Sequence, residues 1–271
     1  MSLRDGLYDA EHKPRLAYAR SYFLGYSDRV PDLEGLKQFY VEWRDYDEYI
    51  VMQKQSNKLR IEGEINRETT AVKCAKRAND VYWWRVGKRI KKLYNLKAQT
   101  LFDPRSNIKR SNVLFVTLTY DVKRTTITEA WETEGEDFNR WIRNLRKKFG
   151  RISYFRSLEA SKKGYPHIHV LMMFHEYEFK VTAIRGKYRI REKEAFEKSW
   201  HSFVDVQVIR RFREGVRYVT KYLTKTKNES KTQVLTLALC WLFRKRSFAI
   251  SGDLQEVIEL SIGHVQMIQT N

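Results

Sequence analysis

Apolar and polar positions alternate along the second half of the chain in a pattern that predicts strands and helices in turn. Short apolar runs bounded by turn residues predict strands at 113–120, 152–159, 167–174 and 204–209. Apolar spacings of three and four residues predict helices at about 137–149, 192–199 and 214–226. The short turn Gly164-Tyr165-Pro166 joins the second and third strands, which favours a hairpin. The pattern therefore predicts an α+β fold, a central antiparallel sheet with helices packed on it, rather than a doubly wound parallel sheet.

A different pattern precedes residue 110. Between about Thr70 and Tyr94, apolar residues recur at mostly three- and four-residue steps, which predicts one long helix with a core face. Much of its remaining surface is basic, including Lys88, Arg89, Lys91 and Lys92. A solvated polar face would account for these charges alone. The neighbouring Trp83 and Trp84 favour a surface that follows a nucleic-acid backbone and stacks bases.

A breaker at residues 103–107, Asp-Pro-Arg-Ser-Asn, separates these two textures. We expect a mainly helical, basic N-terminal region over residues 1–110 as an accessory part. The main domain is expected over residues 111–250, with a C-terminal extension over 251–271. No internal repeat or low-complexity stretch interrupts this organisation.

Net charge indicates the kind of partner. The 271 residues include 52 Lys and Arg against 33 Asp and Glu, a formal charge of +19 with a pI near 9.8. Residues 54–110 alone hold 16 basic and 5 acidic residues. Such a balance favours a polyanion, with nucleic acid ahead of an anionic membrane, because neutralised phosphates release condensed counterions.

Several other classes are disfavoured by composition. No apolar run approaches the roughly 20 residues of a membrane span, and residues 1–10 lack the apolar segment of a secretory signal. We therefore expect no membrane association and a cytoplasmic location. The cysteines, Cys74 and Cys240, are too few for a disulfide framework or a Cys-rich zinc site, which fits a reducing compartment.

The sharpest local signal is the segment Pro166-His167-Ile168-His169-Val170. Residues i and i+2 of a strand share a face, so His167 and His169 stand side by side. Paired histidines on a strand are more often ordinary hydrogen-bonded residues than metal ligands. Here the predicted hairpin also brings the Glu159 carboxylate beside the two imidazoles. Two nitrogens and one carboxylate can hold a divalent ion and leave positions open for a substrate oxygen.

The second signal lies on the helix expected at 214–226. At about 100° per residue, one side of that helix carries Tyr218, Lys221, Tyr222 and Lys225. The opposite side carries the apolar residues Val216, Val219 and Leu223. The tyrosines are therefore not needed for the core, and a solvated surface is the plain alternative to a catalytic one. A phenol with a pKa near 10 needs activation as a nucleophile, and a lysine one turn away from each tyrosine can stabilise phenolate or developing phosphate charge.

Taken together, three ordered segments resemble the motifs of the HUH endonuclease superfamily: Phe115-Val116-Thr117-Leu118-Thr119, Pro166-His167-Ile168-His169 and Tyr218-Val219-Thr220-Lys221-Tyr222. The resemblance covers about residues 111–250 and is to rolling-circle replication initiators of plasmids and viruses. The tyrosine pair, with a lysine between its members, resembles the two-tyrosine group that includes initiators of single-stranded-DNA bacteriophages. Residues 241–248 are similar to the segment that follows the tyrosine helix in some archaeal initiators.

The resemblance implies a five-stranded antiparallel sheet and a metal site for Mg²⁺ or Mn²⁺ that contains His167, His169 and an acidic third ligand, assigned here to Glu159. It implies nicking of single-stranded origin DNA, including a hairpin form, through a 5′-phosphotyrosine intermediate that allows later rejoining. The chain lacks a GxxxxGK[ST] phosphate loop, so unwinding is expected from a host or viral helicase that works with a polymerase in the host cytoplasm. Residues 1–110 match no module of the family.

Other functions remain open on sequence. A conjugative or mobilisation relaxase, or a tyrosine transposase, uses the same chemistry. Two histidines and a carboxylate also form the facial triad of iron(II) oxygenases, but that interpretation leaves the tyrosines and the +19 charge unexplained. A non-catalytic nucleic-acid-binding module with a base-stacking sheet would bind DNA regardless of chelators.

Overall fold

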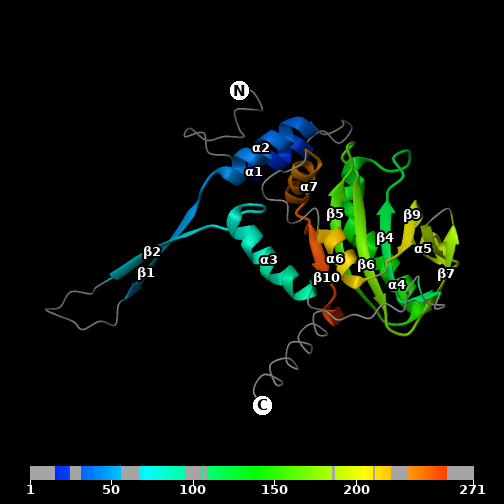
Figure 1. Cartoon of the computed structure of the whole chain (residues 1–271). Helices are drawn as coiled ribbons and strands as arrows, with labels where there is room; N and C mark the ends of the chain where they lie inside the picture. The colour runs from blue at the N-terminus through cyan, green and yellow to red at the C-terminus, as the bar shows by residue number, and fades with distance from the viewer. Residues whose placement is uncertain are drawn as a thin grey trace, which may run out of the picture.

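A five-stranded antiparallel sheet forms the centre of the protein in the computed structural model (Figure 1). The structure describes residues 16–24, 32–55, 67–94, 105, 109–184, 187–209, 211–220 and 231–254. The strand order is β10-β5-β6-β4-β9, and every neighbouring pair is antiparallel. The strands are β4 (Val113–Thr119), β5 (Ile152–Ala160), β6 (Pro166–Phe174), β9 (Val204–Val208) and β10 (Phe248–Ile250). The predicted α+β fold with a central antiparallel sheet is confirmed.

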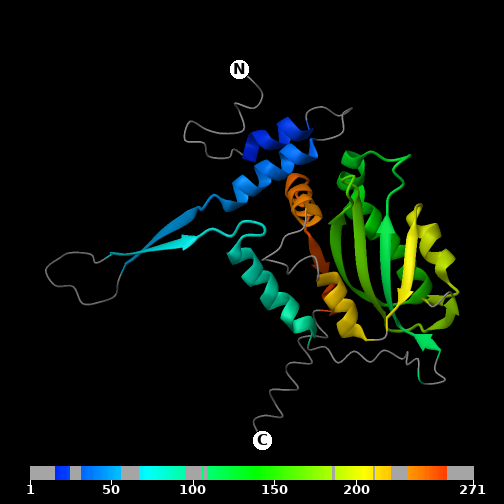
Figure 2. The same cartoon turned by 45° about the horizontal axis from the view of Figure 1, so that its top comes forward.

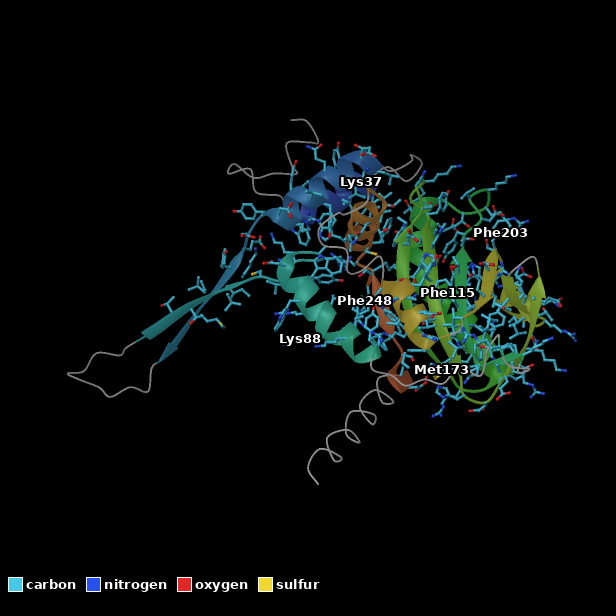
Figure 3. The ribbon with its side chains drawn as sticks, in the orientation of Figure 1. Lys37, Lys88, Phe115, Met173, Phe203 and Phe248 are labelled. Carbon is cyan, nitrogen blue, oxygen red and sulfur yellow. The ribbon has the colours of Figure 1, made fainter. Side chains whose placement is uncertain are left out.

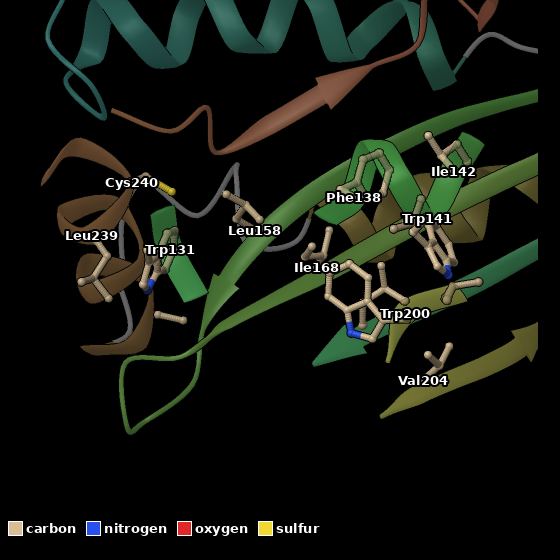
Figure 4. Close-up of a cluster of buried hydrophobic side chains, with 14 of the residues drawn as sticks. Trp131, Phe138, Trp141, Ile142, Leu158, Ile168, Trp200, Val204, Leu239 and Cys240 are labelled. Carbon is tan, nitrogen blue, oxygen red and sulfur yellow. The ribbon is translucent and has the colours of Figure 1, made fainter. Parts of the chain in front are cut away.

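One face of this sheet packs against three helices and forms the larger hydrophobic core. The helices are α4 (Ile127–Phe149), α5 (Lys193–Trp200) and α7 (Lys231–Leu242). Figure 4 shows Trp131, Phe138 and Trp141 of α4 among this cluster, with Ile168 of β6 and Trp200 of α5 close by. The core is therefore built from large aromatic side chains that fill the space between sheet and helices.

Helix α4 is ten residues longer at its start than the predicted helix at 137–149. A capping box formed by Thr126 and Glu129 begins the helix at Ile127. The buried Glu134 interrupts the apolar pattern of this first part, because its carboxylate pairs with Arg156 of β5. A charged residue at a core position thus hid the first turns from a reading of hydrophobic spacing.

The opposite face of the sheet is covered by α3 (Asp80–Tyr94) and α6 (Phe212–Thr220), which share a second hydrophobic cluster with it. Helix α6 crosses β6 closely at Gly215: a Cβ atom there would lie 2.6 Å from Cδ1 of Leu171. Only glycine allows this approach. Helix α6 therefore lies directly on the sheet, and α3 lies beside it (Figure 2).

Residues before 110 form both helices and a ribbon. Helix α1 (Leu16–Leu24) and helix α2 (Leu33–Asp45) lie next to α7, with Phe39 and Tyr40 of α2 in contact with the Trp241 ring. Strands β1 (Tyr49–Gln55) and β2 (Arg67–Lys73) pair as a two-stranded antiparallel ribbon that projects from the body (Figures 1 and 2). The N-terminal region is thus not wholly helical, and it contributes to both hydrophobic clusters.

The prediction of one helix from Thr70 to Tyr94 is wrong in its first part. The β-branched run that includes Val72 pairs with β1, and Ala78 adopts a positive φ of 68° that ends any continuous helix. The Asn79 side chain then accepts a hydrogen bond from the backbone N–H of Tyr82 at 2.9 Å and starts α3.

A small three-stranded sheet lies beside β9, and it was not predicted. It consists of β3 (Arg110–Ser111), β7 (Phe179–Ile184) and β8 (Lys187–Ile190). Both cysteines, Cys74 and Cys240, are free thiols. Within the described ranges, no helix has the length and apolar character needed to cross a membrane.

Candidate active site

The β5–β6 hairpin brings together the residues that the sequence proposed as metal ligands. Its register places Glu159 opposite His167 and Ser157 opposite His169. Gly164 has a φ of +88° in the connecting turn, where the backbone N–H of Ser161 donates to the carbonyl of Tyr165 at 2.8 Å. The turn fixes the register, and all four side chains point to the sheet face that α6 partly covers.

His169 is held between two strands by both of its ring nitrogens. Its Nε2 atom lies 2.7 Å from Oε2 of Glu159, and its Nδ1 atom lies 3.2 Å from Oγ1 of Thr117 on β4. The side chain is 6% exposed. Glu159 and Thr117 therefore set the orientation of the imidazole from opposite sides.

His167 lies one residue pair nearer the end of the sheet, opposite Thr119 of β4 as well as Glu159. Burial lowers the pKa of His167 and the nearby His169 lowers it further, although the Glu159 carboxylate acts in the opposite direction. The imidazole is thereby kept in the neutral form at pH 7. A neutral ring nitrogen is the form that binds a metal ion.

These residues supply a suitable donor set for a divalent cation, two imidazole nitrogens and one carboxylate. In the structure the Glu159 carboxylate contacts His169 directly. Among the residues that the structure describes, no group of three His, Cys, Asp or Glu side chains has an arrangement ready to hold an ion. The donors fit the metal, and Glu159 would turn from His169 toward an ion shared with both histidines.

Tyr218 brings the second predicted motif to the same place. Its ring packs edge-on against His169 with a centroid distance of 6.1 Å, and against Phe115 of β4 at 4.7 Å. The side chain is 46% exposed, whereas Val216 and Val219 on the other side of α6 are fully buried. Tyr218 therefore lies off the core face and beside the histidine pair. Lys221, Tyr222 and Lys225 lie outside the described residues.

The basic residues of α3 border this face. Lys88, Arg89 and Lys91 are exposed, and the side chain of Lys92 lies outside the described residues. The Lys88 Nζ atom sits 3.7 Å from the centre of the exposed Trp84 ring. The Arg89 guanidinium lies 5.7 Å from the centre of the Phe248 ring, and Phe248 is the β10 partner of Ser157. A cation and an aromatic ring thus stand at the β10 edge of the His169 row.

Sequence reasoning missed the residues that support the site. Thr117 and Thr119 alternate on β4 as His167 and His169 do on β6, and a correct pairing of the two strands would have found them. No local signal marks Tyr94, whose hydroxyl lies 2.6 Å from Oγ1 of Thr220 across 126 positions of sequence.

A comparison with protein families connects this geometry to a function. Residues 113–227 match the model of a family described as replication-associated protein of the ORF2 type. The match begins at the first residue of β4 and runs past α6, so it contains the histidine pair and both tyrosines. It supports the role of a Rep-like replication initiator. Searches of curated proteins and of solved structures returned no match.

Proposed function

We propose that the protein is a rolling-circle replication initiator of the HUH, two-tyrosine type, which nicks single-stranded origin DNA and remains covalently attached to it. The observation that carries the proposal is the contact of Tyr218 with His169, which is itself hydrogen-bonded to Glu159. A half-exposed phenol beside a His and Glu pair on a strongly basic protein fits phosphodiester chemistry better than structural packing. The match to the replication-associated family favours origin DNA as the substrate.

In the proposed reaction, the Tyr218 oxygen attacks the scissile phosphorus and a new P–O bond to the tyrosine forms. The bond from phosphorus to the 3′ oxygen breaks, and that oxygen leaves as a hydroxyl with the proton that the phenol gives up. The product is a 5′-phosphotyrosine and a free 3′-OH. The phosphodiester energy is kept, so the reverse attack by a 3′-OH rejoins the strand without ATP.

Glu159, His167 and His169 would hold Mg²⁺ or Mn²⁺, which when bound polarises the scissile phosphate. Lys221 and Lys225 would stabilise the negative charge of phenolate and of the pentacovalent phosphorus. Thr117 orients His169 through its 3.2 Å hydrogen bond. A helicase and a polymerase of the host or virus would supply unwinding and synthesis.

The test is the recovery of a covalent adduct. The protein is incubated with a labelled random-sequence single-stranded library and Mn²⁺, and adducts that survive denaturing electrophoresis are isolated and sequenced at their 5′ ends. Wild-type protein should give an adduct with a consensus at the cleavage position. The double change of Tyr218→Phe and Tyr222→Phe should give none while it retains DNA binding, because only two hydroxyls are removed. Adducts from the double variant would place the nucleophile elsewhere, and DNA binding without adducts from wild type would favour a non-catalytic module.

A further inference from the structure

Phe203 is the most exposed large apolar side chain among the described residues, at 70%. It precedes β9, where Val204, Val206 and Val208 point into the larger core. Alternation along the strand then places Phe203, Asp205 and Gln207 on the other face, which is the face of the histidine pair. The exposed ring therefore belongs to the active-site side of the sheet (Figure 3).

The strand register aligns Phe203 with the proposed metal ligands. Leu118 pairs with Val204, so the next position places Phe203 opposite Thr119, which itself lies opposite His167. Phe203 thus stands two strands from His167, at about 10 Å. In Figure 3, Phe203 and Phe248 lie on opposite sides of Phe115.

The backbone at Phe203 is fixed by several bonds. Its carbonyl accepts the backbone N–H of Thr119 at 3.1 Å and the Thr119 hydroxyl at 3.2 Å. The Trp200 indole N–H donates to the Thr119 carbonyl at 2.8 Å, which ties the end of α5 to the same point. A rigid backbone with a protruding ring is an arrangement suited to a stacking platform.

Unpaired cations surround this end of the sheet. The ends of β4 and β5 and the starts of β6 and β9 lie together, because β6 and β9 run antiparallel to the other two strands. The connecting loops here carry the exposed side chains of Lys123, Lys162 and Lys163, which form no ion pair within the described part of the chain. The surroundings of Phe203 therefore favour an anion that also has a flat apolar surface.

We infer that Phe203 stacks on an unpaired base of single-stranded DNA, within one or two nucleotides of the scissile phosphate. This inference rests on the proposed function for its location relative to the cleaved bond. The base stacks on the ring, and Lys162 and Lys163 contact the phosphates on either side. Stacking on an aromatic ring tolerates any base but requires that the base be free of a duplex, so Phe203 selects for single strands next to the cleavage position.

The experiment measures binding and stacking in EDTA, so that no covalent chemistry is needed. The probes are an oligothymidylate of about 12 nucleotides, with one thymidine replaced in turn by fluorescent 2-aminopurine, and the same strands annealed to a complement. Wild-type protein should quench 2-aminopurine at one position of the single strand. Phe203→Ala should abolish this quenching and weaken binding roughly 5- to 100-fold.

Two further variants make the result specific. Phe203→Leu keeps an apolar side chain without an aromatic ring and should behave as Phe203→Ala, whereas Phe203→Trp should restore quenching and affinity. Tyr49→Ala removes another exposed aromatic ring, on the projecting ribbon, and should bind as wild type does. Unchanged affinity and quenching in Phe203→Ala would overturn the inference. A wild-type protein that shows the quenching but never forms an adduct would contradict the proposed function while leaving the stacking site intact.

Discussion

The hydroxyl of Tyr94, the last residue of α3, lies 2.6 Å from Oγ1 of Thr220, the last described residue of α6. Thr220 directs its own proton to the Val216 carbonyl at 2.8 Å, so the phenol is the donor. This bond joins the N-terminal region to the helix that carries Tyr218. A segment outside the matched family region thus braces the proposed nucleophile.

We therefore predict that Tyr94 is a positioning residue. Tyr94→Phe removes one hydrogen bond and should lower the free energy of unfolding by only about 1 kcal/mol. A small displacement of Tyr218 should slow adduct formation at saturating DNA by roughly 10- to 100-fold while DNA affinity stays unchanged. Single-turnover cleavage and equilibrium binding measure the two quantities.

The matched control is Tyr82→Phe. The Tyr82 hydroxyl lies 3.0 Å from the Ser247 hydroxyl, so this change removes a similar bond between α3 and the start of β10, remote from α6. It should cost comparable stability and leave the cleavage rate near that of wild type. Equal slowing by both changes would show that α3 acts only through overall stability.

The second prediction concerns the ligand set. His169→Ala should abolish cleavage as completely as EDTA does while largely sparing DNA affinity, because the cationic surface is untouched. Glu159→Gln should weaken the binding of Mn²⁺, measured directly by calorimetry without DNA. His175→Ala is the control, because His175 hydrogen-bonds Ser153 at 2.7 Å away from the proposed site. Full activity of a protein that carries both His167→Ala and His169→Ala would eliminate the proposed metal site.

The third prediction concerns the basic face of α3. Changing Lys88, Arg89 and Lys91 to Gln should reduce the salt dependence of single-strand binding by up to three phosphate equivalents, a slope change of about 2. An equal number of charges is removed by the control, in which Arg143, Lys147 and Lys148 on the exposed surface of α4 become Gln. Helix α4 packs on the other face of the sheet, so the control should keep the wild-type slope. Equal slopes for both variants would mean that α3 contributes no local contact.

The site was predictable where strand periodicity determines it. Alternation alone puts His167 and His169 on one face, and the short turn after Ala160 brings Glu159 to them. Helical periodicity likewise separated Tyr218 from the buried Val216 and Val219. The main strands were therefore found to within one or two residues of their ends.

Long-range contacts were not predictable in this way. Helix α6 reaches the histidines because Gly215 allows it to lie against Leu171, and α3 is fixed by hydroxyl pairs that link residues more than a hundred positions apart. The segment around Val72 has spacings that suit a helix, but pairing with β1 decides its structure. Tertiary pairing thus overrides local pattern where the two disagree.

The fourth prediction uses two buried serines of β5 with different partners. Ser157 and Ser153 are both fully buried, but the Ser157 hydroxyl has no hydrogen-bond partner among the described residues, whereas Ser153 contacts His175. Ser157→Ala should leave stability unchanged or raise it, because an unsatisfied buried hydroxyl is removed. Ser153→Ala should lower it by about 1 kcal/mol. Urea unfolding gives both values, and a larger loss for Ser157→Ala would reveal a partner for its hydroxyl.

The last prediction distinguishes the two tyrosines. Tyr218 lies beside His169, and Tyr222 follows it by one helical turn in sequence, so we expect Tyr218 to initiate and Tyr222 to make the next cut. A single tyrosine can nick, but its oxygen is occupied by the DNA end until that adduct is resolved. Tyr222→Phe should therefore form the first adduct at nearly the wild-type rate yet fail to transfer the strand to a second origin copy. Tyr218→Phe should lose the first adduct. A two-substrate assay with differently labelled origin strands separates the two steps, and efficient transfer by Tyr222→Phe would show that one tyrosine serves both cuts.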